Sequence, residues 1–290
     1  MQSLWMLAAS ACFAIMGVFV KLGAPEFKVG ELVLYRSIAM MLVGWAVLAR
    51  AGQPLRTRRF GTHVHRSVSG FVSLFMFFYA LSVLPVATAI TLNYTSPIFL
   101  AALIAWMARE RPGRRLTTTV LLGFLGVLIL LRPSFHAQEL WGGAMGLASG
   151  ALSAVAYWNV RELVQAEEPE GRVVLYFGVI SSLAALVWMA PQKWTPLTLH
   201  NVQFLAGVGI FGALGQLAMT RAYGKGKTLV SAALSYSSIV FSSLIGIVVL
   251  GDVLPLVAWI GIALIVLAGI LAVQLAPSAP RVPPPQITSD

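Results

Sequence analysis

Residues 80–110 read ALSVLPVATAITLNYTSPIFLAALIAWMARE, and the part from 87 to 108 is apolar enough and long enough to cross a lipid bilayer as a helix. Residues 222–252, AYGKGKTLVSAALSYSSIVFSSLIGIVVLGD, begin 142 positions later and follow the same pattern. The shared offset pairs identical residues at Ala80/Ala222, Leu92/Leu234, Tyr94/Tyr236, Ser96/Ser238 and Phe99/Phe241. A near-constant offset of this size indicates an internal repeat.

Similar apolar stretches lie on both sides of this one. The ten predicted spans are 3–22, 29–49, 66–84, 87–108, 116–133, 140–161, 173–190, 202–221, 228–250 and 255–275. Their apolar runs are continuous, whereas the strands of a membrane barrel would alternate polar and apolar residues. The chain is 58% hydrophobic and 10% charged. A soluble domain carries about a quarter charged residues, so this composition excludes a soluble globular protein, and it is too apolar for a disordered chain.

The repeat and the spans together predict the fold class. We expect an all-α integral membrane protein with ten transmembrane helices arranged as two inverted five-helix repeats, because an odd number of crossings turns the second copy over. The repeats are predicted at 1–135 and 136–276, followed by a proline-rich, disordered cytoplasmic tail at 277–290. Inverted repeats are typical of secondary transporters, whose substrate site lies between the halves near the middle of the bilayer.

The net charge of +10 is explained in this interpretation by the orientation of the chain in the membrane. With the N-terminus inside, 15 Lys and Arg residues, Arg66 among them, fall in cytoplasmic segments, and 5, including Arg36, fall on the other side. This bias predicts that both termini are cytoplasmic and that the chain is a multi-pass protein of the inner (cytoplasmic) membrane. Because the cations are divided among short loops without interleaved aromatic residues, we expect no nucleic-acid partner.

Motifs for enzyme chemistry are not supported. Residues 207–212, GVGIFG, match a dinucleotide-binding pattern but lie within an apolar span, where close helix packing is the better explanation. The glycines at 142, 146 and 150 have the same interpretation. The four histidines lack acidic companions, and Cys12 is the only cysteine. We therefore predict no enzyme activity, no catalytic residue, no metal and no cofactor.

Five stretches resemble the drug/metabolite transporter superfamily, in its EamA branch. They are 31–37 (ELVLYRS), 78–87, 93–99 (NYTSPIF), 110–112 (ERP) and 123–133 (GFLGVLILLRP), and the similarity covers nearly all ten spans. Gly251-Asp252 stands where this family usually has Gly-Glu. The resemblance implies a ten-helix carrier with a central cavity, alternating access, and small organic substrates such as amino acids, nucleosides or vitamins.

Polar residues inside spans are the candidate cavity residues, because exposing them to lipid is costly. In the fourth span these are Asn93 and Tyr94, and in its repeat mate Ser235 and Tyr236. Pro97 frees a backbone carbonyl near Asn93 and is predicted to kink the helix there. Packing between helices through small polar groups is the alternative role.

Five other residues complete the candidate set. Trp158 and Asn159 in the sixth span line a pocket or anchor the helix at the membrane interface. Tyr79 faces inward or packs in the core, and Gln216 has no evident structural duty. Arg36 lies about two turns into the second span, where it meets a substrate carboxylate or pairs with a helix C-terminus.

The spans hold no titratable carboxylate at mid-depth, so the cavity is expected to be neutral to positive. This favours amino acids or related zwitterions, carboxylate-bearing metabolites or neutral polar molecules over cationic drugs, with efflux as the expected direction. The alternative is an uptake carrier for S-adenosylmethionine, riboflavin or a nucleoside-like metabolite; a channel or a non-transporting scaffold is remote. The expected partners are a small-molecule substrate and the lipid bilayer. Monomer and homodimer, and proton coupling, facilitated diffusion and exchange, all stay open.

Overall fold

A computed structural model describes residues 2–107, 113–133, 140–251 and 253–275. The predicted tail 277–290 lies outside these ranges, as do the ERP motif at 110–112 and Asp252. Within them the chain is all helical. After a short 3-10 turn at Gln2–Leu4, the helices are α1 Trp5–Gly23, α2 Val29–Arg50, α3 Phe60–Val83, α4 Val86–Asn93, α5 Ser96–Met107, α6 Arg114–Leu131, α7 Leu140–Gln165, α8 Glu170–Met189, α9 Val202–Lys225, α10 Thr228–Ser235, α11 Ser237–Leu250 and α12 Leu256–Gln274.

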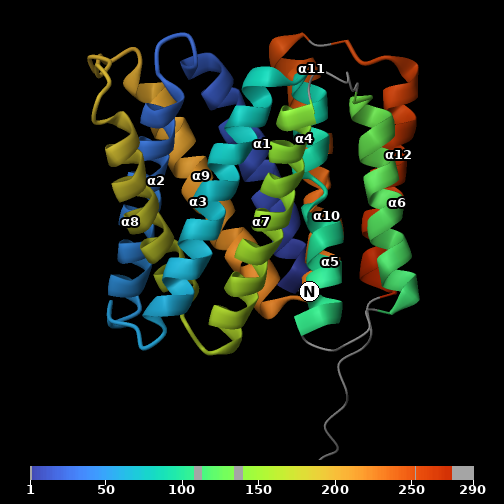
Figure 1. Cartoon of the computed structure of the whole chain (residues 1–290), viewed down its shortest axis with the longest axis horizontal. Coiled ribbons are helices and arrows are strands. Elements are labelled where there is room, and N and C mark those ends of the chain that lie inside the picture. The colour runs from blue at the N-terminus through green and yellow to red at the C-terminus, as the bar shows by residue number, and fades with distance from the viewer. Residues whose placement is uncertain (1, 108–112, 134–139, 252, 276–290) are drawn as a thin grey trace, which may run out of the picture.

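The helices stand side by side as a bundle of rods (Figure 1). Nine segments of the described chain are long and apolar enough to span a membrane, and α4–α5 and α10–α11 each form one of them. The tenth rod, α7, has 26 residues and is long enough, but its glycines, serines and polar aromatics make it less apolar. The ten predicted spans are therefore present as rods, with ends shifted by a few residues.

Two rods are interrupted at matching positions. The fourth rod breaks at Tyr94–Thr95, two residues before Pro97, and the ninth breaks at Tyr236 without a proline nearby. At the first break, an added Cβ on Gly150 of α7 would lie 2.8 Å from the Leu92 carbonyl oxygen. Gly142 and Gly146 also face the end of α3 and α4, so the three glycines let α7 approach closely.

The most extensive contacts pair α2 with α8, α3 with α7, α1 with α9, and α6 with α12. Exchanging α1–α6 in order with α7–α12 maps this set of pairs onto itself. The α2–α8 and α6–α12 pairs lie at opposite edges of the bundle (Figure 1), and the rods between them surround its centre.

Glycines bring the backbones of both edge pairs together. In the α2–α8 pair, a Cβ on Gly178 would lie 2.5 Å from the Met41 amide nitrogen, and one on Gly44 would lie 2.7 Å from the Leu175 amide nitrogen. In the α6–α12 pair, Gly126 and Gly261 each leave room for the other's carbonyl oxygen, at 2.8 and 2.7 Å. Because backbone atoms cannot rotate away, these contacts need glycine.

At each end of the bundle a buried carboxylate joins neighbouring segments of the chain. The buried Glu31 side chain at the start of α2 accepts hydrogen bonds from the Thr195 amide (2.6 Å) and hydroxyl (2.9 Å), which joins α2 to the segment before α9. At the opposite end, Glu168 accepts hydrogen bonds from Arg172 Nη1 (2.7 Å) and Thr57 Oγ1 (2.5 Å). Glu168 thereby joins the α2–α3 loop to α8.

Candidate substrate cavity

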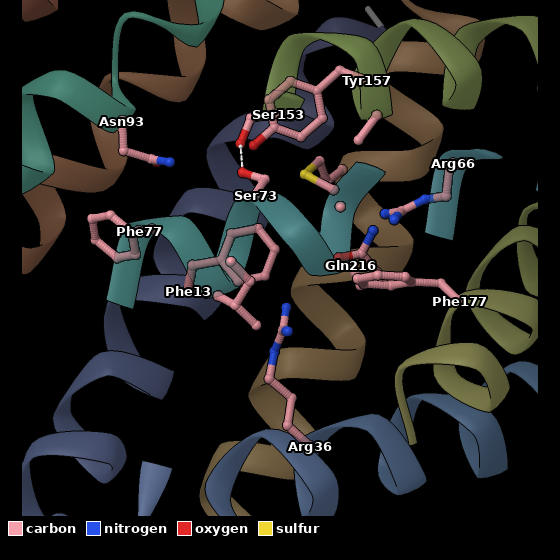
Figure 2. Close-up of a pocket in the computed structure, with 14 residues that line it drawn as sticks. Phe13, Arg36, Arg66, Ser73, Phe77, Asn93, Ser153, Tyr157, Phe177 and Gln216 are labelled. Carbon is pink, nitrogen blue, oxygen red and sulfur yellow. Dashed lines mark hydrogen bonds between the residues drawn. The ribbon is translucent and has the colours of Figure 1, made fainter. Parts of the chain in front are cut away.

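A cavity of about 230 Å³ lies in the middle of the bundle. Its walls come from α1, α2, α3 and α4 of the first half of the chain and from α7, α8 and α9 of the second half. The residues that Figure 2 labels around it are Phe13, Arg36, Arg66, Ser73, Phe77, Asn93, Ser153, Tyr157, Phe177 and Gln216. Both halves of the chain therefore contribute to one chamber.

Two arginines reach this chamber from opposite ends of the bundle. Arg36 lies seven residues after the start of α2, and Arg66 six residues after the start of α3, so each lies about 10 Å along its helix. Since α2 and α3 run in opposite directions (Figure 1), the two side chains enter from opposite faces and converge near Gln216 (Figure 2).

The placement of Arg66 corrects the sequence analysis, which began the third span at residue 66 and counted this arginine among cytoplasmic loop cations. The helix begins at Phe60, and Arg66 is buried at 2% exposure. The residues before it, including the fully buried His63, are less apolar than the span that follows, which is why hydropathy placed the boundary too late.

Neither guanidinium is fully satisfied by the protein. Arg36 Nε, Arg66 Nε and Arg66 Nη1 are buried without a hydrogen-bond partner among the described residues. The guanidinium carbon of Arg66 lies 3.7 Å from the centroid of the Phe177 ring, a cation–π contact. The described residues that line the chamber include no aspartate or glutamate.

Two glycines make room for these arginines. A Cβ added to Gly70 would lie 2.7 Å from Arg66 Nη1, and one added to Gly212 would lie 3.1 Å from Arg36 Cγ and Nε. Gly212 closes the 207–212 glycine motif, whose Gly207 packs on the Phe19 ring. In the structure this motif is a helix-packing surface of α9.

Serine and asparagine side chains connect the helices of the chamber wall. Ser73 of α3 donates to the Ser149 carbonyl oxygen of α7 (2.7 Å) and shares a 2.8 Å hydrogen bond with Ser153 (Figure 2). Asn93 Nδ2 at the end of α4 donates to Ser149 Oγ at 3.0 Å. The amide of Asn93 thus lies at the chamber wall beside the break in the fourth rod.

Aromatic rings form much of the remaining wall. Phe13 and Phe77 lie on the Asn93 side of the chamber, away from Arg66 (Figure 2). Tyr157 stacks on Tyr223, with ring centroids 4.7 Å apart. The chamber therefore has an end with two guanidiniums, where the Phe177 ring covers Arg66, and an uncharged end with Phe77 and Asn93.

Three of the nine candidate cavity residues, Arg36, Asn93 and Gln216, line this chamber within the described chain. Gln216 is 2% exposed, and its Nε2 has no partner among the described residues. Tyr79 does not line the chamber: it faces outward at 39% exposure. Phe77 takes the inward position, and two further residues turn a helix by about 200°.

The three candidates around the breaks lie behind the chamber wall. The rings of Tyr94 and Tyr236 are neighbours, with centroids 6.3 Å apart, and Tyr236 is fully buried against Gly123 of α6. Ser235 donates to the Ala232 carbonyl oxygen of its own helix at 2.7 Å. The structure brings the repeat-related tyrosines together, but apart from the arginines.

Trp158 and Asn159 line a different pocket of about 440 Å³ between α3, α5 and α7. The Arg161 guanidinium carbon lies 4.9 Å from the Trp158 ring centroid, and Asn159 is buried with Nδ2 unpartnered among the described residues. On α7 it is instead Ser153, Ala156 and Tyr157 that face the central chamber.

Sequence reasoning missed the α3 contribution almost entirely. Arg66, Gly70, Ser73, Leu74 and Phe77 follow helical spacing and form one stripe along the chamber. That stripe was the available signal and lies within the predicted span 66–84, but Arg66, at the first position of that span, was counted among the loop cations. The structure also shows no group of three or more metal-ligating side chains in the described ranges.

The family comparison matches the chain twice. The model of the EamA-like transporter family covers residues 1–132 and 140–274, which leaves a short gap near the middle of the chain and excludes the tail.

Relatives of several kinds match over most of their length. A Helicobacter pylori (strain J99) protein described as an uncharacterized transporter is 30% identical over 276 residues, with 91% of this chain and 92% of the relative covered. A pseudopaline exporter, CntI, of Pseudomonas aeruginosa is 28% identical and covers 81% and 82%. A riboflavin transporter of Vibrio cholerae is 28% identical and covers 92% and 90%.

A solved crystal structure has the same fold. It superposes with a TM-score of 0.82 at 22% identity and covers 95% of this chain and 98% of the other. The chain and this structure therefore share their helical architecture.

Proposed function

The chain belongs to the EamA-like transporter family, and on that basis we propose that it exports small carboxylate-bearing metabolites, amino acids or related zwitterions among them, through the central chamber. That the protein is a multi-pass secondary transporter, and not an enzyme, follows from family membership. The finer statement rests chiefly on one observation, which is a chamber with two arginines and no described carboxylate between the halves of the chain.

The helix pairing supports alternating access between repeats at 1–135 and 136–276. The paired set is unchanged when α1–α6 are exchanged with α7–α12, as two-fold-related halves require. The edge pairs α2–α8 and α6–α12 touch backbone to backbone, so they are suited to act as fixed supports. The remaining rods would then tilt between them and open the chamber to one face at a time.

The relative named as a pseudopaline exporter supports export as the direction. The bias of basic residues supports cytoplasmic termini in the inner membrane. In Figure 1 the N-terminus and the end of α12 lie at the same face, as this topology requires.

The test is flux into liposomes that contain the purified full chain, with labelled amino acids and carboxylates at the outer face. We expect saturable uptake that is accelerated by unlabelled substrate inside the liposomes, as carriers show and channels do not. Asn93→Ala should reduce this flux, whereas Val187→Ala, on the exposed face of α8, should leave it unchanged. Non-saturable flux, or none for any of these compounds, would overturn the proposal.

Uptake of a larger substrate is the second candidate, because a riboflavin transporter matches 92% of this chain. The chamber argues against uptake of a larger substrate, since pockets for drug-sized ligands usually measure about 300–1,000 Å³ and this cavity measures about 230 Å³. Labelled riboflavin and S-adenosylmethionine in the same liposomes decide between the two candidates.

A further inference from the structure

The arginine pair defines the substrate more narrowly than the proposed function does. Arg36 and Arg66 line the same chamber and their guanidiniums point toward Gln216 (Figure 2). A buried cation without an anion is costly, and two of like sign at one site are more so. Such an arrangement in a membrane interior indicates a bound counter-ion.

A substrate with a single negative charge would neutralise only one of the two buried guanidiniums. The guanidiniums come from opposite faces of the bundle, on different helices. Beside each of them a glycine without a side chain leaves room, Gly212 for Arg36 and Gly70 for Arg66. Between them Gln216 Nε2 is a further buried donor without a described partner. Unpaired donors on three elements, α2, α3 and α9, therefore surround one point from different sides.

The other end of the chamber has a different chemistry. Phe13 and Phe77 offer ring faces, and Asn93 offers an amide oxygen that accepts no described hydrogen bond. An organic body, including an ammonium group attached to it, fits this end through ring faces and the amide. An ammonium placed at the arginine end would instead face two positive charges.

Building on the proposed transport function, we propose that the substrate is an organic molecule with two anionic charges, called a dianion below whether or not it also carries an ammonium group. It presents the two anionic charges to Arg36 and Arg66 and its organic body to Phe13, Phe77 and Asn93. Two carboxylates or one doubly ionised phosphate monoester satisfy this chemistry. Two carboxylates that accept hydrogen bonds from the guanidiniums and one phosphate between the guanidiniums differ in how their charge depends on pH.

Binding to the purified full chain, separate from transport, tests the proposal. The probes are L-glutamate and L-glutamine, which differ by one carboxylate, together with succinate and glycerol 3-phosphate. We expect glutamate or succinate, or the phosphate ester, to bind at least about tenfold tighter than glutamine and to raise the thermal unfolding midpoint. Binding of glycerol 3-phosphate should tighten between pH 5.5 and 7.5, because the second pKa of a phosphate monoester is about 6, while L-glutamate, whose side-chain pKa is about 4.3, should change little.

Variants assign the effect to the two arginines. Arg36→Gln and Arg66→Gln should each weaken dianion binding by about ten- to a hundredfold, and Arg58→Gln, an equal charge change at an exposed loop residue, should not. Without ligand, Arg66→Gln should unfold at the same temperature as the wild type or higher, because it removes a buried unpaired charge. If that variant does not fold, Gly70→Ala keeps the charge but displaces Arg66 Nη1, and should also weaken binding.

The outcomes separate the two proposals. Equal binding of glutamine and glutamate, absence of binding by every dianion, or binding unchanged in both arginine variants would overturn the dianion site. Dianion binding without flux in liposomes would leave the site in place and overturn transport. Flux of amino acids that have only one carboxylate, without dianion binding, would support transport and overturn the dianion site.

Discussion

At the scale of single residues, Glu168 shows how one carboxylate joins three segments. Burial raises its pKa, but hydrogen bonds from Thr57 and Arg172 and the positive charge of Arg172 outweigh burial and lower the pKa below its ordinary value. Arg172 in turn donates to the Pro54 carbonyl oxygen at 2.6 Å. The ionised form is therefore the one that stabilises the fold.

Replacing Glu168 with glutamine should lower the free energy of unfolding at neutral pH by about 2 kcal/mol, since charged hydrogen bonds contribute about 1.5–3 kcal/mol each. Because the folded pKa is lowered, this contribution is complete above the ordinary pKa of 4.5 and disappears as pH falls through the folded value. Thermal midpoints of wild type and Glu168→Gln should therefore differ at pH 7 and converge in acid. A gap that widens in acid would contradict this assignment.

The sequence indicates how deep a polar residue lies in a span, but not which way its side chain points. Arg36 and Gln216 were proposed because a charged or amide group deep in a span needs a reason, and both line the chamber. Tyr79 and Trp158 were proposed as aromatic residues with a polar group within a span, but Tyr79 faces outward and Trp158 lines another pocket. Which side of a helix faces the cavity depends on its neighbours, and a single span does not state it.

At the scale of helices, reciprocal glycines fix the edge pairs. Gly178→Ala should destabilise the protein by about 1–3 kcal/mol, because its Cβ would lie 2.5 Å from the Met41 amide nitrogen and α8 would have to move. Gly143→Ala on α7 is the matched control, since nothing lies within 4 Å of its Cβ. The measurement is the unfolding midpoint of both variants. Equal shifts would show that the α2–α8 contact does not depend on glycine.

The breaks in the fourth and ninth rods support a second prediction. Pro97 lies in the first turn of α5, where proline is tolerated, and the equivalent break at Tyr236 has no proline. Pro97→Ala should therefore shift stability by less than about 1 kcal/mol. Gly150→Ala should shift it more, because its Cβ would lie 2.5 Å from Thr95 Oγ1 and 2.8 Å from the Leu92 carbonyl oxygen. A larger effect from Pro97→Ala would assign the break to proline.

The membrane-spanning helices were the feature of this molecule that could best be predicted from the sequence. Continuous apolar runs with Gly and Pro between them specify rods to within a few residues, because the bilayer sets their length. The predicted kink position near Asn93 coincides with the break, but the ninth rod breaks at the matching position without a proline, where Tyr236 packs on Gly123. The proline rule points only to the first of these two breaks.

At the scale of the whole molecule, the pairs α2–α8 and α6–α12 sit at the two edges and the chamber sits between them (Figure 1). Contacts between α3 and α7 and between α1 and α9 therefore have to change if the chamber opens alternately. The Ser73–Ser153 hydrogen bond crosses the α3–α7 contact, and the Asn93–Ser149 hydrogen bond joins α4 to α7 beside it. Because hydrogen bonds act only over a short distance, these bonds should break when the helices around the chamber move apart.

The unneutralised guanidiniums also bear on the return half of the carrier cycle. Closing an empty chamber would strip water from two cations that have no described carboxylate beside them, whereas closing a loaded one would enclose a neutralised pair. Reorientation without cargo should thus be the slow step, and each outward journey should require an inward one with a similar anion. Liposomes preloaded with substrate should take up label at least about tenfold faster than empty liposomes, and Arg66→Gln should narrow that ratio. Two buried charges without counter-ions would in this way make the protein an obligatory anion exchanger.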